Sequence, residues 1–202
     1  MADRLSDEVL ALSAGEGSIS AFEELFGRYK KPILNFIYRL IGNRETAEEV
    51  AQETFIKAYN SLGIFDPKRK FSTWLYTIAR NLAKNSIRDK KYFRDISLEG
   101  TVFGNEECLR LKNTIADPNA RPDIIAQDNE LAEEAQKVLG SLPIEYKEVI
   151  TLCSIQGLSL KEAAAIIGCS IASVSIRLNK AKMLFMKRLG IERKDIEGSD
   201  DR

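Results

Sequence analysis

The feature that most restricts the fold of this chain is a pair of short helices, separated by a glycine turn, within residues 158–189. Ser159 is placed to cap the first helix, and Glu162 follows three residues later, as in a capping box. Gly168 stands where that helix must end in a left-handed residue. The second helix begins near Ile171, and its apolar seam recurs every three or four residues at Val174, Leu178, Ala181 and Phe185. The pattern predicts a helix-turn-helix.

The remaining sides of the second helix predict a DNA contact. Its first turns hold small residues, which would let this end enter the major groove and bring side chains to base edges. Between Ser170 and Gly190 the chain carries five basic residues and no acidic one, as phosphate contacts require. The expected DNA contacts are Ser173, Ser175, Ile176, Arg177, Asn179, Lys180 and Lys182. An ordinary helical hairpin with a solvated basic face is the alternative for this segment alone.

Composition excludes several classes of protein. The 202 residues, 44% of them hydrophobic, suffice for one large domain or two small ones, and no apolar run could span a bilayer. The charged N-terminus lacks the apolar segment of a secretion signal, so we expect a cytoplasmic protein without membrane contact. With no histidine and three cysteines outside any CxxC motif, we expect no metal site, no cofactor and no disulfide scaffold.

The net charge is zero, but the charges are unevenly distributed. Residues 1–60 carry seven basic and ten acidic side chains, whereas residues 68–94 carry nine basic ones and a single acid, Asp89. Residues 101–140 return to four basic and eight acidic. Basic segments separated by acidic ones predict two nucleic-acid surfaces and at least one surface for a different partner.

Helical periodicity dominates the chain and no alternating strand is convincing, which predicts an all-α fold. We expect a helix over residues 6–13, and a second one capped by Ser20 that Pro32 kinks or splits. A third helix should run from Asn43 to about residue 62, and a fourth, capped by Ser72, to about residue 90.

The helical pattern fails after residue 92, where glycines and prolines occur without any period. We therefore predict two small helical domains, residues 1–92 and 126–190, joined by a flexible linker over residues 93–125 and followed by a polar tail at 191–202. Domains linked in this way should reorient relative to each other in the free protein.

The fourth helix carries amides and cations on the face opposite its apolar seam, and a basic loop precedes it. Cations can hold a nucleic-acid backbone while amides read unstacked bases, so this face suits single-stranded nucleic acid. The candidate residues are Lys68, Arg69, Lys70, Thr77, Arg80, Asn81, Lys84, Asn85 and Arg88. A merely solvated surface is the alternative. For Phe71, Trp74 and Tyr76 we expect places in the core rather than roles as base-stacking platforms.

The third helix has the opposite charge. Its exposed side should carry Glu45, Glu48, Glu49, Gln52 and Glu53. Early acids stabilise a helix through its dipole, which is one explanation. The other is a docking surface for a basic or helical partner.

Several runs resemble one family. Residues 47–55 (AEEVAQETF) and 71–81 (FSTWLYTIARN) look like the second conserved region of bacterial sigma factors of the extracytoplasmic-function (ECF) group. Residues 21–26 (AFEELF) before them, and Leu142-Pro143 with the helix-turn-helix after them, are similar to the same family. The resemblance covers nearly the whole chain apart from the linker and the last dozen residues.

The resemblance implies a subunit that binds RNA polymerase core and directs it to promoters. The third helix would dock on the clamp of the largest polymerase subunit. The fourth helix and its loop would melt the −10 element and capture a flipped base, with Asn81 and residues 66–70 at those positions. The helix-turn-helix would read the −35 element, although Ser175, Ile176 and Asn179 depart from common family residues, so the preferred sequence stays open. An anti-sigma factor would be expected to cover both the polymerase-binding face and the DNA-binding face.

Two other classes of protein fit the sequence less well. A repressor or response-regulator output domain would share the helix-turn-helix, but it would not require the amide-rich and acidic helices as well. An enzyme is disfavoured, because we find no catalytic residues: there is no histidine, no glycine-rich phosphate loop and no pair of acids in an apolar context.

Overall fold

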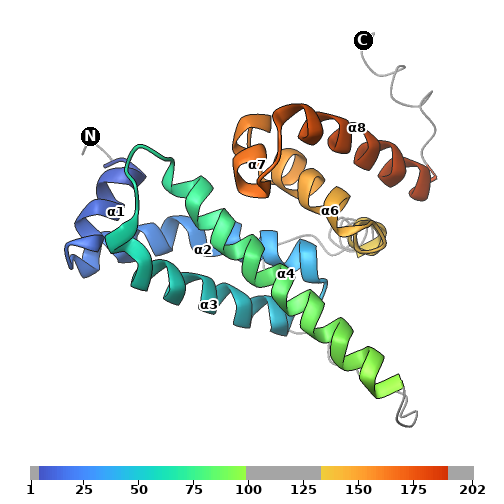
Figure 1. Ribbon diagram of the computed structural model, residues 1–202, viewed down its shortest axis with the longest axis horizontal. Helices are drawn as coiled ribbons and strands as arrows, with labels where there is room; N and C mark the ends of the chain where they lie inside the picture. Colours follow the sequence, from blue (N-terminus) through green and yellow to red (C-terminus); the bar gives the residue numbers. More distant parts are fainter. Residues whose placement is uncertain (1–4, 99–132, 191–202) are drawn as a thin grey trace, which may run out of the picture.

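The computed structural model describes residues 5–98 and 133–190, and every regular element within these ranges is helical (Figure 1). The all-α prediction is therefore confirmed. The N-terminal part contains four α-helices and a 3-10 turn: α1 (Asp7–Gly15), α2 (Ile19–Ile41), α3 (Arg44–Ser61), η1 (Leu62–Ile64) and α4 (Phe71–Leu98). None of the described helices is long and apolar enough to cross a membrane.

Side-chain caps set where the first three helices begin. The Ser6 hydroxyl accepts a hydrogen bond from the N–H of Val9, and the Asn43 amide oxygen accepts one from Thr46, as expected for N-caps. The prediction that Ser20 caps the second helix is wrong. Ser18 has the extended backbone of an N-cap and accepts from Ala21, because the helix starts one residue after it.

Pro32 does not split the second helix, since α2 is helical from Ile19 to Ile41. A proline removes one backbone hydrogen bond, but α2 buries apolar side chains on both sides of it, including Leu25 and Phe36. Packing of α2 against α1, α3 and α4 outweighs that loss, as tertiary contacts commonly outweigh local preference.

Helix α4 begins earlier and ends later than the sequence predicted. It starts at Phe71, so Ser72 lies inside the helix and is not its N-cap. The helix continues to Leu98, past the expected end near residue 90 and past the expected domain boundary at 92. Residues 99–132 and 191–202 lie outside the described ranges, and so does most of the predicted linker.

The C-terminal part begins with helical residues 133–140 and continues through α6 (Ile144–Ile150) into one π-helical turn, η3 (Thr151–Ile155). It ends with α7 (Leu160–Ile167) and α8 (Ile171–Arg188). Ser159 and Glu162 form the predicted capping box, and Gly168 ends α7 at φ 78°, a left-handed conformation. The helix-turn-helix is confirmed.

The two parts of the chain pack against each other. Helix α4 contacts α7, and α2 contacts α6 and η3 (Figure 1). One hydrophobic cluster crosses the boundary: it holds Phe36 and Leu75 from the N-terminal part together with Leu152 and Ile166 from the C-terminal part. This arrangement differs from the expected pair of independently moving domains, because apolar side chains of both parts are buried against each other.

Candidate nucleic-acid interfaces

Helix α3 exposes its acidic face as predicted. Its buried side is apolar and small, with Ala47 and Ala58 fully buried against α2 and α4. The five candidate residues on the other side, Glu45, Glu48, Glu49, Gln52 and Glu53, are all exposed. In Figure 1, α3 lies on the side of α4 away from the C-terminal part, so the helix-turn-helix does not cover this face.

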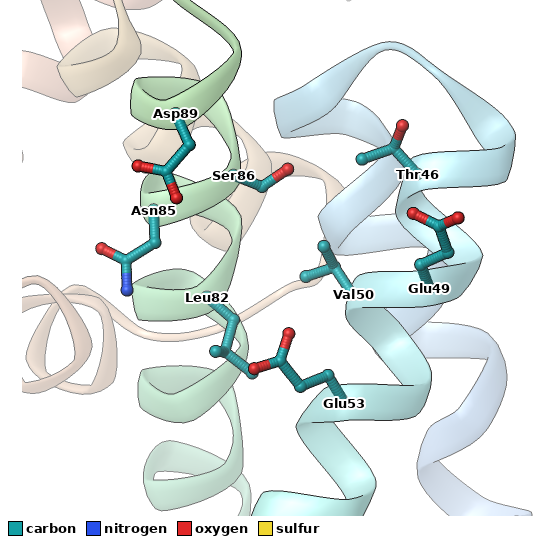
Figure 2. A pocket seen from close by; sticks show the side chains of 8 residues that line it. All are labelled: Thr46, Glu49, Val50, Glu53, Leu82, Asn85, Ser86 and Asp89. Carbon is teal, nitrogen blue, oxygen red and sulfur yellow. The ribbon is translucent and has the colours of Figure 1, made fainter. Parts of the chain in front are cut away.

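A cleft of about 480 Å³ lies between α3 and α4, and Figure 2 shows the side chains that line it. Glu49 and Glu53 line it from α3, and Asp89 lines it from α4. The apolar floor is formed by Val50 and Leu82. A groove with an apolar floor and acidic walls is suited to a partner helix that carries basic side chains.

The amide and basic face of α4 is only partly open. Its buried seam includes Leu75, Ala79 and Leu82. Four candidate residues of the helix, Asn81, Lys84, Asn85 and Arg88, are exposed, while Thr77 and Arg80 are half-buried. The aromatic expectation holds as well, because Phe71 and Tyr76 are buried in the core and Trp74 packs against Phe65 and Phe71.

The loop before α4 forms one wall of a second cleft, of about 750 Å³, between the two parts of the chain. Lys68, Arg69 and Lys70 line it from the loop, and Trp74 and Thr77 line it from α4. The opposite wall is α7, with Lys161 and Glu162. The structure therefore places the predicted loop cations and α4 at one site. Helix α7 of the helix-turn-helix lines the opposite side of this cleft.

Two cations of α4 are paired with an acid of the C-terminal part. Nη2 of Arg80 donates to Oε2 of Glu148 at 3.1 Å, and Nε of Arg80 lies 3.0 Å from Oε1 without hydrogen-bond alignment. Nζ of Lys84 lies 3.9 Å from the same Oε1. The Glu148 side chain is 2% exposed and that of Arg80 12%, so this pair is largely shielded from water.

A second ion pair joins the loop to the helix-turn-helix. Nζ of Lys70 donates to Oε1 of Glu162 at 2.8 Å. This contact, together with hydrogen bonds from Ser159, lowers the pKa of Glu162 from 4.5 to about 2. Burial raises the pKa of Tyr76, whose hydroxyl donates to Oε1 of Gln156 in the C-terminal part at 2.8 Å.

Helix α8 turns the predicted apolar seam toward the core. Val174 and Ala181 of its seam are fully buried, and Leu178 and Phe185 are half-buried. Of the seven predicted contact residues, Ile176, Asn179, Lys180 and Lys182 are exposed, and Ser173, Ser175 and Arg177 are half-buried. Ile176 is 69% exposed, so its side chain is not buried against any helix within the described residues.

Glu148 and Gln156 are not among the site residues predicted from the sequence. A signal for Glu148 was present, because Ile144, Glu148 and Leu152 recur at intervals of four residues along one helical face. An acid in the middle of an apolar face indicates a buried partner. Which cation pairs with it depends on how the two parts pack, and this periodicity does not specify it.

Fold and surfaces together define the class of protein: an all-helical chain with a helix-turn-helix and a separate helix that presents cations and amides. Two protein families match the chain: Sigma-70 region 2 matches residues 25–92, and Sigma-70, region 4 matches residues 132–184. The chain belongs to the sigma factors of bacterial RNA polymerase, and its relatives place it in the ECF group.

Curated relatives support this assignment over most of the chain. The ECF RNA polymerase sigma factor SigW of Bacillus subtilis (strain 168) is 37% identical over 174 residues, which cover 86% of this chain and 91% of SigW. The ECF RNA polymerase sigma-E factor of Haemophilus influenzae is 31% identical over 196 residues, covering 94% and 98% of the two chains.

A solved structure has the same fold. CnrH, an RNA polymerase sigma factor of Cupriavidus metallidurans, in complex with the cytosolic domain of CnrY, aligns with a TM-score of 0.68 and 27% identity. The alignment covers 91% of this chain and 97% of CnrH.

Proposed function

We propose that this sigma factor joins core polymerase to promoter DNA through three separate faces: the acidic face of α3, the amide and basic face of α4 with its loop, and the outer face of α8. The observation that carries the proposal is that the acidic and basic candidate residues occupy different helices and do not mix. A subunit that bridges an enzyme and two DNA elements needs surfaces of this kind.

The acidic face of α3 is the proposed polymerase-docking surface. Glu45, Glu48, Glu49, Gln52 and Glu53 are exposed, and the groove beside them has acidic walls. Complementary charge raises the rate of encounter and selects the orientation of a partner. We expect the partner to be a basic helical segment of the polymerase clamp.

The face of α4 is the proposed −10 interface. Lys68, Arg69 and Lys70 of the loop, with Arg80, Lys84 and Arg88 of α4, would hold the backbone of the displaced strand. Thr77, Asn81 and Asn85 would contact bases, because a hydroxyl or an amide can both donate to and accept from an unstacked base. Asn81 is exposed and free to meet a flipped base.

The outer face of α8 is the proposed −35 interface. Ser173, Ser175, Ile176 and Asn179 lie toward the start or middle of the helix, where base edges are read, and Ile176 offers an apolar contact for a thymine methyl. Arg177, Lys180 and Lys182 would contact phosphates.

We further propose that the protein acts in the cytoplasm, with the polymerase, and is not an enzyme in its own right. Regulation by an anti-sigma factor is supported by the CnrH structure, in which the cytosolic domain of CnrY is bound. The exposed Ile171, Ile176 and Met183 on α8 offer apolar surface to such a partner.

Run-off transcription tests the function directly. Purified chain is added to core polymerase on a library of promoters, with core alone as the control. Promoter-dependent transcripts that require the chain are expected, together with co-purification with core. A protein that bound a duplex operator tightly by itself, and did not bind core, would instead be a repressor.

A further inference from the structure

Tyr146 of α6 contacts a lysine of the proposed −35 face. Nζ of Lys180 lies over the Tyr146 ring, 5.7 Å from the ring centroid. At this distance a cation is attracted by the negative face of an aromatic ring. The contact joins two helices of the C-terminal part, because α6 packs against α8 (Figure 1). A residue outside the helix-turn-helix therefore reaches one of the cations proposed to contact DNA.

The Tyr146 ring is fixed by packing. Tyr146 is half-buried and packs on a small hydrophobic cluster that contains Leu142, Ile150 and Ala181. A packed ring has few alternative rotamers, whereas an exposed lysine side chain has many. Lys180 is exposed, and the contact with the fixed ring restricts where its ammonium group lies.

An aromatic ring orders a cation without neutralising it. In an ion pair such as that of Lys70 with Glu162, the acid offsets the charge that a phosphate contact needs. Residues 171–189 contain no acid. The attraction to the ring comes from its quadrupole, so the ammonium group keeps its positive charge. Lys180 is therefore ordered and still able to bind an anion.

The position of Lys180 indicates which anion it would bind. Lys180 lies about one helical turn after Ile176, and its contact with Tyr146 directs its side chain toward α6. Ile176 and Asn179 are the residues proposed to meet bases on the outer face of α8. A cation held at the edge of that face suits a phosphate beside the groove better than a base inside it.

We propose that Tyr146 is a positioning residue for −35 binding, which holds the Lys180 ammonium group ready for a DNA phosphate. The inference rests on the −35 function proposed above for α8. Ordering a flexible side chain at the moment of binding reduces affinity, and a side chain that is ordered beforehand avoids part of that loss. Tyr146 thus raises promoter affinity without touching a base, and α6 becomes part of the −35 site.

Proton NMR of the free chain tests the contact itself. Protons above the face of an aromatic ring resonate upfield, so the Cε protons of Lys180 should lie upfield of their position in an unstructured lysine. Tyr146→Leu should remove this shift, and Tyr146→Phe should keep it. A Lys180 resonance that Tyr146→Leu leaves unchanged would overturn the inference.

Promoter binding by the holoenzyme tests the positioning. The probe is a labelled duplex carrying a promoter recovered in the run-off assay, titrated with core polymerase loaded with each variant. Tyr146→Leu should weaken binding about two- to fivefold, the order expected for ordering one side chain, and Tyr146→Phe should bind as wild type. The slope of log affinity against log salt should persist in Tyr146→Leu, because the phosphate contact remains. It should fall by about one unit in Lys180→Met.

A double-mutant cycle separates positioning from packing. Once Lys180→Met has removed the ammonium group, Tyr146→Leu should have no further effect on promoter affinity, so the two losses are not additive. Lys182→Met is the matched control, because Lys182 lies about half a turn away around α8. Its loss should add to that of Tyr146→Leu. Additive losses for Tyr146 and Lys180 would overturn the inference and leave Tyr146 with a packing role alone.

Folding and the proposed function are checked separately. Circular dichroism verifies the folding of each variant, and Tyr146→Met, which also lacks a ring, takes the place of Tyr146→Leu if that variant does not fold. If the wild-type holoenzyme binds no promoter, the function proposed for α8 fails and this inference fails with it. If Lys180→Met weakens promoter binding and Tyr146→Leu does not, only the positioning role of Tyr146 fails.

Discussion

The carboxylate of Glu8 accepts a hydrogen bond from the backbone N–H of Phe71, with 3.1 Å between Oε1 and N. Phe71 is the first residue of α4, so an acid of α1 caps a helix that begins more than sixty positions later. The first N–H groups of a helix have no partner within it, and negative charge is favoured beside them. The contact fixes the start of the proposed −10 helix against α1.

Glu8→Ala is therefore expected to destabilise the N-terminal domain by about 1 kcal/mol, the usual loss for a helix cap. Urea unfolding followed by circular dichroism measures it. Glu23→Ala, which removes an exposed acid from α2, is the control and should have little effect. Equal stability of the two variants would mean that the Glu8 contact contributes nothing in solution.

Asn81→Ala is expected to impair promoter opening more than initial binding. An amide that reads an extruded base acts only after the strands have separated, so the loss of about 1–3 kcal/mol should fall on the opening step. Permanganate footprinting of the bubble, beside gel-shift measurement of the closed complex, distinguishes the two steps. Asn35→Ala, an exposed amide of α2, is the control. Equal losses at both steps would contradict the role given to Asn81.

Substitutions on α8 should have two distinct effects. Changes at Ser175, Ile176 or Asn179 should alter the preferred −35 sequence, because we propose that these side chains contact base edges. Changes at Lys182 or Lys187 should weaken binding to all promoters alike and reduce the salt slope by about one unit per lost phosphate contact. Selection from randomised −35 elements measures the first effect, and unchanged preference in the first group would mean that another face of α8 enters the groove.

Reversing charge on α3 should weaken docking on core. Glu49→Lys with Glu53→Lys places two cations on the acidic wall of the α3–α4 groove, where like charges would oppose a basic partner. We expect affinity for core polymerase to fall about tenfold or more, measured by fluorescence titration. Glu145→Lys on α6 controls for net charge. Normal affinity of the double variant would exclude this groove from the docking surface.

Glu162→Gln should lower stability in a pH-dependent manner. The pKa of Glu162 falls from 4.5 to about 2 in the folded protein, mainly through the Lys70 contact. Its contribution is therefore complete above pH 4.5 and is lost as the pH falls toward 2. Glutamine can keep the capping box but cannot pair with Lys70. The Tm of the variant should lie below that of wild type at pH 7, and the difference should shrink below about pH 4. A difference that stays constant with pH would exclude the charge as its cause.

Much of the fold was predictable because helix signals are local. The capping box of Ser159 and Glu162, the glycine at 168 and the seam of α8 all act within a few residues, and each is found as predicted. The exposed face of α3 follows from the same periodicity. Errors occurred where a distant residue decides the outcome, as at the start of α4, where Glu8 supplies the cap, and at Pro32, where packing keeps α2 continuous.

The sequence by itself determined the helices, the helix-turn-helix and the family, and it indicated which faces carry acids, amides and cations. Periodicity, caps and motif order are read along the chain and need no knowledge of what lies opposite. Only the tertiary structure decided that Arg80 and Lys84 lie against Glu148 and that Lys70 lies against Glu162. These pairs join segments far apart in sequence, and they depend on how two apolar surfaces pack.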